Sequence, residues 1–595
     1  MIAAASLDLA VIGNCNIAAL IDAGGAIVWG CWPRLDGDPL FSALVGGSAP
    51  THGFFSIGFD ETATRHQTYE RNTAIVRTVL TAPDGASFSI TDFVPRFRQF
   101  GRVYRPLMIV RIVEPLSGMP SIRVRMRPSD DEGRASTGMV AGSNHVRYVV
   151  DGRAVRLTTD ASINHVVGEN LFVLTRPLTF IVHPDETLAD SAERIGRDFH
   201  ERTAAHWRDW VRALNVPFEW QDVVIRAAIT LQLCSFEDTG AIVAALTTSI
   251  PEAPGTERTW DYRFCWIRDA YFTVHALNRV GATPTMEKFI DYVTNIIALE
   301  RGPSLKPLYR IVPEDALDEI TLPALPGYRG QGPVRIGNAA RDQLQHDVYG
   351  SVILAARQMF FDERLPKKGD EALFRLLEPL GMCALRHALT PDAGIWEYRE
   401  RTGIHTHSAT MCWVACDRLA RIAEKLGLAA DAAKWRTSAD DLRAIILARA
   451  WNANGFFAGT LDGADLDASV LLLHELGIVE AGDERFVATV DRIGADLGHG
   501  GHIRRYIAPD DFGTPTVAFT ICSFWYVDAL AAIGRVEEAR TLFEDLIAHR
   551  NPLGLLSEDI DPATGELWGN FPQTYSMSGL IVAAMRLSRS WEAGK

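Results

Sequence analysis

The period of the hydrophobic pattern changes once along this 595-residue chain, close to residue 186. Before that point apolar and polar residues alternate, as in IRVRMR at 122–127 and HVRYV at 145–149. Alternation places the apolar side chains on one face of a β-strand. Beyond it, apolar residues recur every three or four positions, as they do on one face of a helix. The chain is therefore expected to join an all-β part to an all-α part.

The first part, residues 1–185, has the pattern of a large antiparallel β-sandwich. Turn signals at 22–25, 83–85 and 151–152 separate short strand-like runs, and many short strands between regular turns are typical of a sandwich. Residues 186–216 carry Ile195, Phe199, Trp207 and Trp210 among charged residues. This spacing predicts a helical linker between two domains.

The second part, residues 217–595, is expected to form an (α/α)6 barrel. Amphipathic segments are predicted at 218–236, 268–281, 284–299, 341–361, 369–389, 407–426, 429–451, 465–476, 483–494, 516–532, 534–548 and 573–590. A helical solenoid would show a repeat of about 34–45 residues and short loops. The sequence shows no such repeat, and its aromatic loops at 250–267, 302–340, 391–406, 500–515 and 552–572 are long. Helix pairs closed into a double ring, with functional loops at one end, fit this pattern better.

Composition excludes several classes of protein. Hydrophobic residues make up 47% and charged residues 22% of the chain, which suits a globular protein with a large core. The formal net charge of −15 repels phosphate and anionic lipid, so neither nucleic acid nor a membrane is an expected partner. The first residues lack the basic region of a signal peptide. The eight scattered cysteines are expected to be buried free thiols, which fits a cytoplasmic protein.

The first chemically unusual segment is TWDYRFCWIRD at residues 259–269. It includes Trp260, Trp266, Arg268 and Asp269. Sugars stack their C–H faces on aromatic rings, and their hydroxyl groups favour hydrogen bonds with charged side chains. The segment therefore suits a sugar-binding site, although an ion-pair network between helices would need the same residue types.

Two further loops carry candidate catalytic carboxyl groups. In GIWEYR at 394–399, Glu397 lies between Trp396 and Tyr398, and aromatic surroundings favour a protonated acid. A glutamate that supports the N-terminus of a helix would look the same. The segments LSEDID at 556–561 and GELWGNFPQ at 565–573 offer a candidate base, or else an acidic turn or a calcium loop without EF-hand spacing.

No cofactor or metal is expected from the sequence. His405 and His407 form an HxH pair, but no further Cys or His in a zinc-binding pattern lies near them. A solvated pair is the simpler interpretation. The chain has neither a phosphate-binding P-loop nor a dinucleotide-binding motif, and it has no GxSxG elbow.

Together these loops resemble those of glycoside hydrolase family 15, the glucoamylase and bacterial trehalase family. The resemblance also includes IGNC at 12–15, PRLD at 33–36, TTSIPE at 247–252, GYRG at 327–330 and QLQ at 343–345. It runs nearly from end to end, with the motifs in the order of the family. It implies a trehalase-like β-sandwich, a helical linker and an (α/α)6 barrel.

The resemblance also implies roles for single residues. Glu397 matches the general acid and Glu558 the general base. Arg268 and Asp269 match the pair that binds the deepest glucose, and Trp266 and Trp396 match aromatic residues of that pocket. Trp260 and Arg329 stand in similar motifs and are further expected sugar contacts. An inverting glycosidase holds its two carboxyl groups about 6.5–9.5 Å apart with a water between them.

The expected activity is inverting, exo-acting hydrolysis of a short α-glucoside that releases β-glucose, with α,α-trehalose as the best substrate. Tyr398 stands where fungal glucoamylases have a second acidic residue, and no starch-binding module is expected. Hydrolysis of isomaltose-type or malto-oligosaccharides remains an alternative. An inverting phosphorylase and a non-catalytic sugar-binding protein are others. Whether the chain forms a homo-oligomer is left open.

Overall fold

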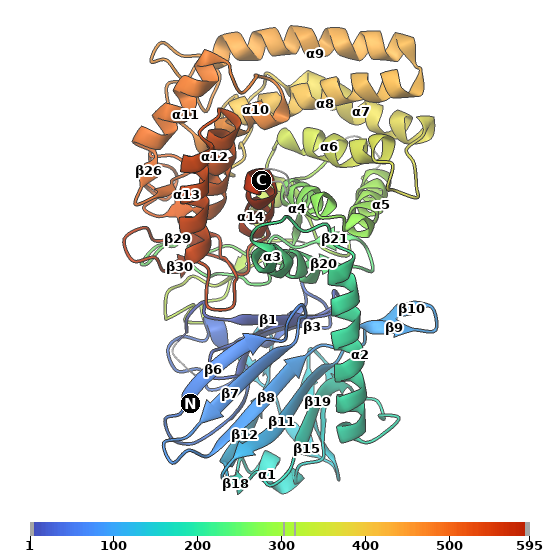
Figure 1. Ribbon diagram of the computed structural model, residues 1–595, viewed down its shortest axis with the longest axis vertical. Coiled ribbons are helices and arrows are strands. Elements are labelled where there is room, and N and C mark those ends of the chain that lie inside the picture. Colours follow the sequence, from blue (N-terminus) through green and yellow to red (C-terminus); the bar gives the residue numbers. More distant parts are fainter. Residues whose placement is uncertain (1–4, 301–303, 314–316, 590–595) are drawn as a thin grey trace.

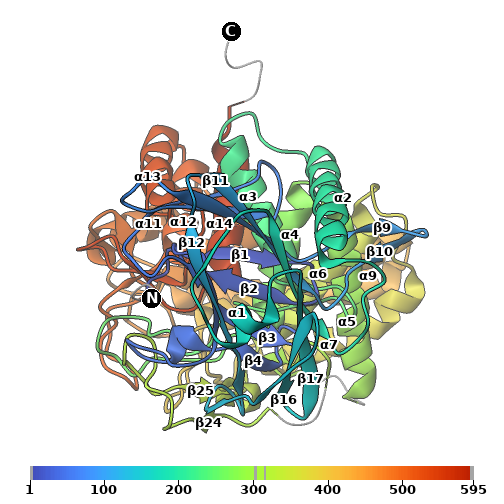
Figure 2. The ribbon, with the colours of Figure 1, turned by 90° about the horizontal axis from the view of Figure 1, so that it is seen from below.

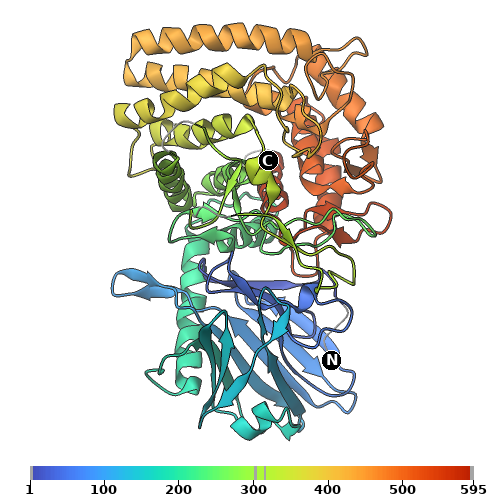
Figure 3. The ribbon, with the colours of Figure 1, turned by 180° about the vertical axis from the view of Figure 1, so that it is seen from behind.

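The protein consists of a β part and a helical part stacked along its long axis (Figure 1). The structure is a computed structural model that describes residues 5–300, 304–313 and 317–589. Residues 1–4, which enter the expectation about a signal peptide, and residue 590, the end of the last expected helix, lie outside this description. The view from behind shows the β9–β10 hairpin projecting from the side of the β part (Figure 3).

The β part contains two antiparallel sheets. The first has the strand order β1-β2-β3-β5-β12-β18, with β4 paired to β3. Its strands are β1 (Ala10–Gly13), β2 (Ala18–Ile21), β3 (Ile27–Trp32), β4 (Asp38–Phe41), β5 (Phe54–Gly58), β12 (Ser121–Arg127) and β18 (Phe172–Val173). The second has the order β15-β16-β17-β19-β11-β8-β7-β6. Its strands are β6 (Thr64–Tyr69), β7 (Val76–Thr81), β8 (Ser87–Phe93), β11 (Ile109–Ser117), β15 (Met139–Ala141), β16 (His145–Val150), β17 (Arg153–Thr159) and β19 (Leu178–Pro184).

The alternating sequence pattern accounts for the core between these sheets. In β12, Ile122, Val124 and Met126 are buried while the arginines between them point outward. The buried residues join one hydrophobic cluster with residues of the second sheet. Phe55 of the first sheet meets Phe180 of the second edge to face, with ring centroids 6.2 Å apart. The predicted antiparallel sandwich is confirmed.

Helix α2 (Ala192–Arg212) joins the two parts. It begins at Ser191, whose hydroxyl accepts a hydrogen bond from the backbone N–H of Arg194, an ordinary N-cap. Ile195 packs with residues of the second sheet, whereas Trp207 belongs to the large cluster of the helical part. Seen from below, α2 lies at the side of the sandwich (Figure 2). One helix is thus anchored in both domains.

The helical part is a double ring. The inner helices are α4 (Ile267–Arg279), α6 (Asp347–Phe361), α8 (Thr406–Leu426), the short pair η3 (Ala468–Leu472) and α10 (Leu473–Leu476), α12 (Thr520–Ala532) and α14 (Thr574–Leu587). Each contacts the next, and α14 contacts α4, so the inner ring closes. The outer helices are α3 (Gln221–Leu233), α5 (Thr283–Leu299), α7 (Glu371–His387), α9 (Ala429–Ala450), α11 (Glu484–Asp496) and α13 (Val536–Ala548). The predicted (α/α)6 barrel is confirmed.

Burial distinguishes inner from outer helices. The inner helix α8 is buried on almost every side, whereas the outer helix α11 buries only Phe486, Thr489, Val490 and Ile493. That spacing is one stripe of an amphipathic helix. Inner helices also approach closely, since a Cβ added to Gly350 of α6 would lie 2.3 Å from the carbonyl oxygen of Met411 in α8. Only glycine fits that crossing.

Short paired strands and turns complete the fold. In the β part these are β9 (Phe97–Gln99) with β10 (Arg102–Tyr104), β13 (Ser129–Asp130) with β14 (Ala135–Ser136), and α1 (Ile163–Val167). The short turn η1 (Ala43–Val45) also belongs to the β part. In the helical part they are β20 (Ser235–Phe236) with β21 (Ala241–Ile242), β22 (Cys265–Trp266) with β23 (Leu308–Tyr309), β24 (Ile320–Thr321) with β25 (Arg335–Ile336), β26 (Gly498–His499) with β27 (His502–Ile503), β28 (Ala518–Phe519) with β29 (Asp559–Ile560) and β30 (Leu567–Trp568), and η2 (Ala339–Asp342).

Polar contacts fix the two parts to one another. The indole of Trp29 in β3 donates to the carbonyl oxygen of Leu246 at 2.7 Å. Asn551, in the loop after α13, donates to the carbonyl oxygens of Leu7 and Leu9, both at 2.9 Å. These bonds join segments several hundred residues apart. They place the first sheet under the loops of the barrel.

Several predicted helix boundaries differ from the structure. The segment expected at 516–532 begins at Thr520, and the helix expected at 465–476 is the short turn η3 followed by α10. The start of α6 also differs. The helix expected at 341–361 begins only at Asp347, because residues 343–346 are irregular. The side chains of Gln343 and Gln345 in this irregular stretch donate to Glu397. A helix starting at 341 would place these side chains differently, so the contacts with Glu397 override the helical pattern.

The cysteine prediction is confirmed, since all eight cysteines are buried and free. No helix in the described parts of the chain combines the length and the apolar composition that a membrane crossing requires.

Candidate active site

A deep pocket lies at the end of the barrel where the inner helices begin. Arg268 and Asp269 stand in the first turn of α4, Phe519 precedes α12, and Gln573 precedes α14. The pocket holds about 810 Å³ of empty space, its open mouth included. Its walls comprise Ala244, Glu252, Arg258, Trp260, Tyr262, Trp266, Arg268, Asp269, Asn338, Ala340, Ile395, Trp396, Glu397, Tyr398, Arg399, Arg505, Tyr506, Asp510, Asp511, Phe512, Phe519, Glu558, Gln573 and Tyr575.

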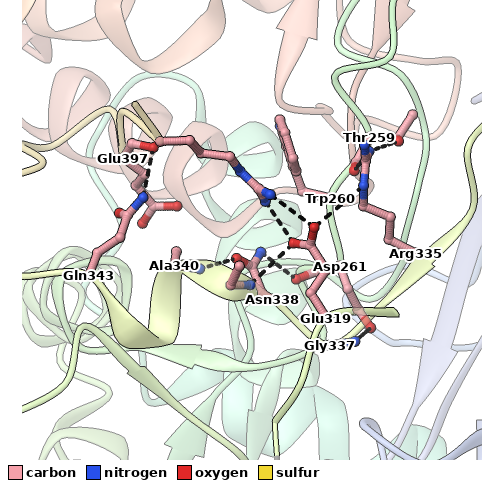
Figure 4. Close-up of polar contacts among 12 residues, drawn as sticks. Thr259, Trp260, Asp261, Glu319, Arg335, Gly337, Asn338, Ala340, Gln343 and Glu397 are labelled. Atoms are coloured by element: carbon pink, nitrogen blue, oxygen red, sulfur yellow. Dashed lines mark hydrogen bonds and ion pairs between the residues drawn. The ribbon is translucent and has the colours of Figure 1, made fainter. Parts of the chain in front are cut away.

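Glu397 is held by three donors on one oxygen. Its Oε1 accepts from the indole of Trp266 at 2.6 Å, from Nη2 of Arg268 at 3.1 Å and from the amide of Gln345 at 3.2 Å. The backbone carbonyl of Glu397 also accepts from Gln343 (Figure 4). These bonds hold the carboxyl group in one orientation in the pocket wall.

The backbone of Glu397 is strained. Its φ is +60°, in the left-handed region that non-glycine residues rarely adopt. Such a conformation costs about 1–3 kcal/mol and persists where the surroundings enforce it, often at functional sites. The bridge between Asp392 and Gly403 closes the base of this loop. The strain therefore indicates that the surrounding structure fixes the position of the Glu397 side chain.

Glu558 lies on the loop that leads into β29 and is buried, with 1% of its surface exposed. Its Oε1 accepts from the hydroxyl of Tyr262 at 2.8 Å, and its Oε2 from the backbone N–H of Asn570 at 3.3 Å. Burial raises the pKa of Glu558 to about 8, and the nearby carboxylate of Glu252 adds to the rise. The group therefore exchanges a proton close to neutral pH.

A glycine makes room for Glu558. Gly569 has a φ of +75°. A Cβ there would lie 2.6 Å from the Cβ of Glu558 and 2.8 Å from its Oε2. The hairpin between β29 and β30 thus brings bare backbone against the carboxyl group.

Two aromatic residues of one motif link the carboxyl groups. Tyr262 bonds to Glu558 and Trp266 bonds to Glu397. The two rings meet edge to face with centroids 5.3 Å apart. The structure thus brings Glu397 and Glu558, which are far apart in sequence, into one pocket.

Arg268 and Asp269 line the same pocket. Arg268 donates to Glu397 and, through Nη1, to Gln345 at 2.9 Å. Asp269 is 5% exposed, and its Oδ2 has no hydrogen-bond partner, only an ion-pair contact of 3.5 Å with Nε of Arg268. Burial raises the pKa of Asp269 to about 7, although Arg268 opposes the rise. A buried acceptor without a donor suits a ligand that brings hydroxyl groups.

Trp396 and Trp260 form parts of the wall. The indole of Trp396 donates to Asp467 at 2.7 Å, and its ring packs against Phe519. The indole of Trp260 donates to Glu252 at 2.9 Å. The guanidinium groups of Arg335 and Arg399 lie over the Trp260 ring. Both arginines pair with Glu319, which Figure 4 shows beside Trp260 and Arg335.

The expectation that Arg329 contacts sugar is not met by its position. Arg329 is not among the residues that line the pocket. Its Nε donates to the carbonyl oxygen of Ala5, and Nη1 pairs with Glu566 at 2.7 Å. Its guanidinium group also lies over the ring of Trp568. Arg329 therefore ties the N-terminal segment to the β29–β30 turn, because the turn at 327–330 faces the β part.

The motif at 259–269 serves both alternatives that the sequence left open. Asp261 and Arg263 form a buried ion pair, with two hydrogen bonds of 2.9 and 2.7 Å. Arg263 also donates to the carbonyl oxygen of Gly37 in the β part. Trp260, Tyr262, Trp266, Arg268 and Asp269 line the pocket. The ion-pair network and the sugar-type wall thus share one segment.

Several pocket residues were not singled out from the sequence. Glu252 pairs with Arg505 at 2.6 Å in the wall beside Glu558, and Tyr262 and Gln345 contact the two carboxyl groups. Arg505 lies in the long loop at 500–515, which was expected to be functional. The length of this loop was the only sequence feature that pointed to Arg505. Glu252 stands alone among apolar residues and prolines, which was an available signal for a buried charge.

The prediction that His405 and His407 form a solvated pair is wrong. Both are buried, with 8% and 2% of their surfaces exposed. His405 stacks on Tyr398 with ring centroids 5.6 Å apart. Burial lowers the pKa of His405 to about 4 and that of His407 to about 3, so both rings are neutral at neutral pH. Their place at the start of the inner helix α8 explains the burial.

Comparison with known proteins assigns the chain. Residues 220–585 match the model of glycosyl hydrolases family 15, and residues 3–169 match the trehalase-like N-terminal model. The chain belongs to glycosyl hydrolases family 15. This glycoside hydrolase is 31% identical to a trehalase of Mycolicibacterium smegmatis, over 98% of this chain and 91% of that protein. It is 29% identical to a trehalase of Thermoplasma volcanium, over 97% and 93% of the two chains.

A solved structure supports the fold of this family 15 member. The crystal structure of a bacterial glucoamylase complexed with acarbose matches with a TM-score of 0.72 and 14% identity. The match covers 98% of this chain and 94% of that chain. The sandwich, the linker and the barrel therefore form one arrangement in both proteins.

Proposed function

We propose that this family 15 glycoside hydrolase is an inverting, exo-acting α-glucosidase whose substrate is α,α-trehalose. The observation that carries the proposal is one pocket holding two carboxyl groups in different surroundings. Glu397 is hydrogen-bonded to Arg268, Trp266 and Gln345. Glu558 is buried and bonded to Tyr262. Inverting hydrolysis of a glycoside requires two carboxyl groups at one pocket, and the family motifs that contain Glu397 and Glu558 support their roles as acid and base.

In the proposed reaction Glu397 is the general acid. It gives a proton to the oxygen that leaves with the second glucose, since glucose is a poor leaving group without one. Glu558 in its ionised form takes a proton from a water that attacks the anomeric carbon from the opposite face. The bond to the leaving oxygen breaks as the bond to water forms. The first glucose is released as the β-anomer.

The polar groups of the pocket support a glucose in its deepest part. Asp269 offers an unpartnered oxygen and Arg268 an adjacent guanidinium group. Such charged groups bind hydroxyls strongly, and a ligand lacking those hydroxyls leaves them unpaired. Trp266 and Trp396 supply apolar wall. The second glucose is proposed to lie nearer the mouth, beside Trp260 and Arg399.

Trehalose is preferred over other α-glucosides because trehalases match along nearly the whole chain, β part included. A substrate panel tests this choice. Glucose release is measured from trehalose, isomaltose, maltose and malto-oligosaccharides, each with and without inorganic phosphate. The highest kcat/KM on trehalose is expected, without any need for phosphate. A preference for malto-oligosaccharides, or glucose 1-phosphate as the product, would replace the proposal by its alternatives.

The stereochemistry tests the roles of the two carboxyl groups. Proton NMR in the first minutes of trehalose hydrolysis should show equal amounts of new α- and β-glucose. Release of α-glucose alone would show a retaining enzyme. Glu397→Gln should lose orders of magnitude in kcat while still binding sugar, because the amide keeps the shape but donates no acidic proton. Glu558→Ala should abolish turnover.

A cytoplasmic location is part of the proposal. It rests on the eight buried free cysteines, since structural thiols stay reduced in that compartment. Fractionation of the source cells with a trehalose-hydrolysis assay tests it, and activity recovered outside the cytoplasm would contradict it.

A further inference from the structure

His502, Asp545 and His549 form a polar cluster outside the active-site pocket. His502 begins β27, Asp545 lies in the last turn of α13, and His549 directly follows that helix. Figure 1 shows the β26 hairpin beside α13, at the edge of the barrel. Within the described residues, this is the one group of three or more His, Cys, Asp or Glu side chains whose donor atoms gather closely enough to hold a metal ion.

The donor atoms are close to the spacing that a metal needs. One nitrogen or oxygen from each of the three side chains lies within 4.8 Å of the others. The two imidazole rings have centroids 4.9 Å apart and cross at 78°. Zinc binds imidazole nitrogen and carboxylate oxygen at about 2.0–2.2 Å, which puts the ligands of a tetrahedral ion roughly 3.3–3.6 Å apart. Asp545 is exposed, so rotation of its side chain can close the remaining gap.

His502 carries an unsatisfied polar atom. Only 1% of its surface is exposed, and its buried Nδ1 has no hydrogen-bond partner. Buried polar atoms nearly always have a partner, because an unpaired one costs free energy. The ring faces His549 and Asp545. A bound cation at the cluster would account for a buried histidine nitrogen that has no hydrogen-bond partner among the described residues.

His549 is oriented as metal ligands usually are. Its Nδ1 lies 2.9 Å from the carbonyl oxygen of Asp545. With the proton on Nδ1 donated to that carbonyl, the lone pair is left on Nε2. The spacing of four residues also puts Asp545 and His549 on one face of the helix end. The backbone bond thus selects the tautomer that a metal requires.

Two glycines let the backbone close around the donors. A Cβ on Gly501, whose φ is +82°, would lie 3.2 Å from Oδ2 of Asp545. A Cβ on Gly565 would lie 3.2 Å from Cδ2 and 3.5 Å from Nε2 of His549. The β26–β27 turn and the β29–β30 turn therefore both border the cluster.

We propose that His502, Asp545 and His549 bind one zinc ion, with water as the fourth ligand. Two imidazoles and one carboxylate suit zinc and related transition metals rather than calcium or magnesium, which prefer all-oxygen sites. The ion would fasten β27 to the end of α13. Arg505, two residues beyond β27, pairs with Glu252 in the active-site wall. The proposed role of the ion is to steady the strand that leads into the pocket.

The test uses the full chain, produced without a histidine tag and stripped with a chelator. Calorimetric titration with zinc chloride should give one bound ion per chain, and bound zinc should raise the melting temperature. His549→Ala and Asp545→Asn should each weaken binding by roughly tenfold to a hundredfold or more. Both residues are at least partly exposed, so these variants are expected to fold without zinc. His66→Ala, which removes an exposed histidine of β6, is the matched control and should bind as the parent does.

Absence of stoichiometric binding by the parent chain would overturn the proposal. So would equal affinity and equal thermal stabilisation in His549→Ala and the parent chain. Trehalose hydrolysis is measured on the same samples. Zinc binding that is lost in His549→Ala while glucose release continues supports the metal site and leaves the proposed activity in place, so the two proposals fail independently.

Discussion

The indole nitrogen of Trp266 donates a hydrogen bond of 2.6 Å to Oε1 of Glu397. The two residues come from different loops, and Glu397 has a strained left-handed backbone. Arg268, two residues after Trp266, donates to the same oxygen. Two residues of one short segment, Trp266 and Arg268, thus donate to the proposed acid. The loop of Glu397 contributes the strained backbone that carries the carboxyl group.

Trp266→Phe should therefore lower activity without unfolding the protein. Phenylalanine keeps an aromatic wall but removes the donor. This donor holds the carboxyl group in place, and a small misplacement of a catalytic group can cost about a hundredfold, so kcat/KM on trehalose should fall roughly tenfold to a hundredfold. Steady-state kinetics and a melting curve measure the two effects separately.

Trp435→Phe is the matched control for that variant. Trp435 is also buried and donates its indole N–H to a glutamate, Glu378, at 3.2 Å, but on the outer helices. It should lose stability and keep kcat/KM. Equal kinetic losses in Trp435→Phe and Trp266→Phe would mean that the bond to Glu397 has no special part in the reaction.

Glu252→Gln should shift the pH dependence of the enzyme. Burial first, and then the Glu252 carboxylate, raise the pKa of Glu558 to about 8. The proposed base works only when ionised, so kcat/KM rises with pH through this pKa. Removal of the Glu252 charge lowers the pKa of Glu558 and should move the acidic limb of the profile to lower pH. A limb that stays in place or moves to higher pH would contradict the assignment of Glu558 as base.

Tyr262→Phe should move the same limb the other way. The hydroxyl of Tyr262 donates to Glu558 at 2.8 Å and stabilises its ionised form. Without this donor the pKa of Glu558 rises further, and the acidic limb should move to higher pH. The opposite directions distinguish an electrostatic effect from general damage to the pocket, which would shift both variants alike.

The sequence pattern was enough for the architecture. Alternation in IRVRMR at 122–127 and helical spacing beyond residue 217 report which faces are buried, and burial decides whether elements form sheets or rings. The predicted start of α6 was wrong because the side chains of Gln343 and Gln345 donate hydrogen bonds to Glu397. A local pattern contains no information about a carboxyl group more than fifty residues away.

The site was only partly predictable for the same reason. Residue type and neighbours identified Glu397 and Glu558 as candidates, and the fold brings both to one pocket. Arg329 shared the residue type of a sugar ligand, but its turn faces the β part and pairs with Glu566. The direction in which a side chain points depends on which domain packs against its loop. Tertiary packing determines this, and the local sequence does not.

Gly569→Ala should reduce activity more than stability. A Cβ at Gly569 would lie 2.6 Å from the Cβ of Glu558, in a backbone with φ of +75°. The backbone strain alone costs about 1–2 kcal/mol, and the contact would displace the proposed base. A loss of kcat by a hundredfold or more is expected.

The control for Gly569→Ala is Gly477→Ala. Gly477 has a φ of +85°, but an added Cβ would meet nothing within 4 Å. It therefore has the strain without the contact, and its melting temperature should fall while kcat stays near that of the parent chain. A comparable loss of kcat in both variants would show that displacement of Glu558 is not the cause.

Asp269→Asn should weaken catalysis and yet stabilise the protein in a pH-dependent way. Burial raises the pKa of Asp269 to about 7, from an unfolded value of roughly 3.9. Below pH of about 4 the carboxyl group is protonated in both states and has no differential effect. Between about pH 4 and 7 the unfolded chain ionises more readily than the folded one, so this group lowers the free energy of unfolding as pH rises. Asparagine cannot ionise, so the melting temperature of the variant should exceed that of the parent chain at pH 8 and match it at pH 4.

At pH 7 kcat/KM of Asp269→Asn on trehalose should fall roughly tenfold to a hundredfold, since a charged partner for a sugar hydroxyl is lost. An equal loss of melting temperature at both pH values, with normal kcat/KM, would make Asp269 a structural residue rather than a sugar ligand.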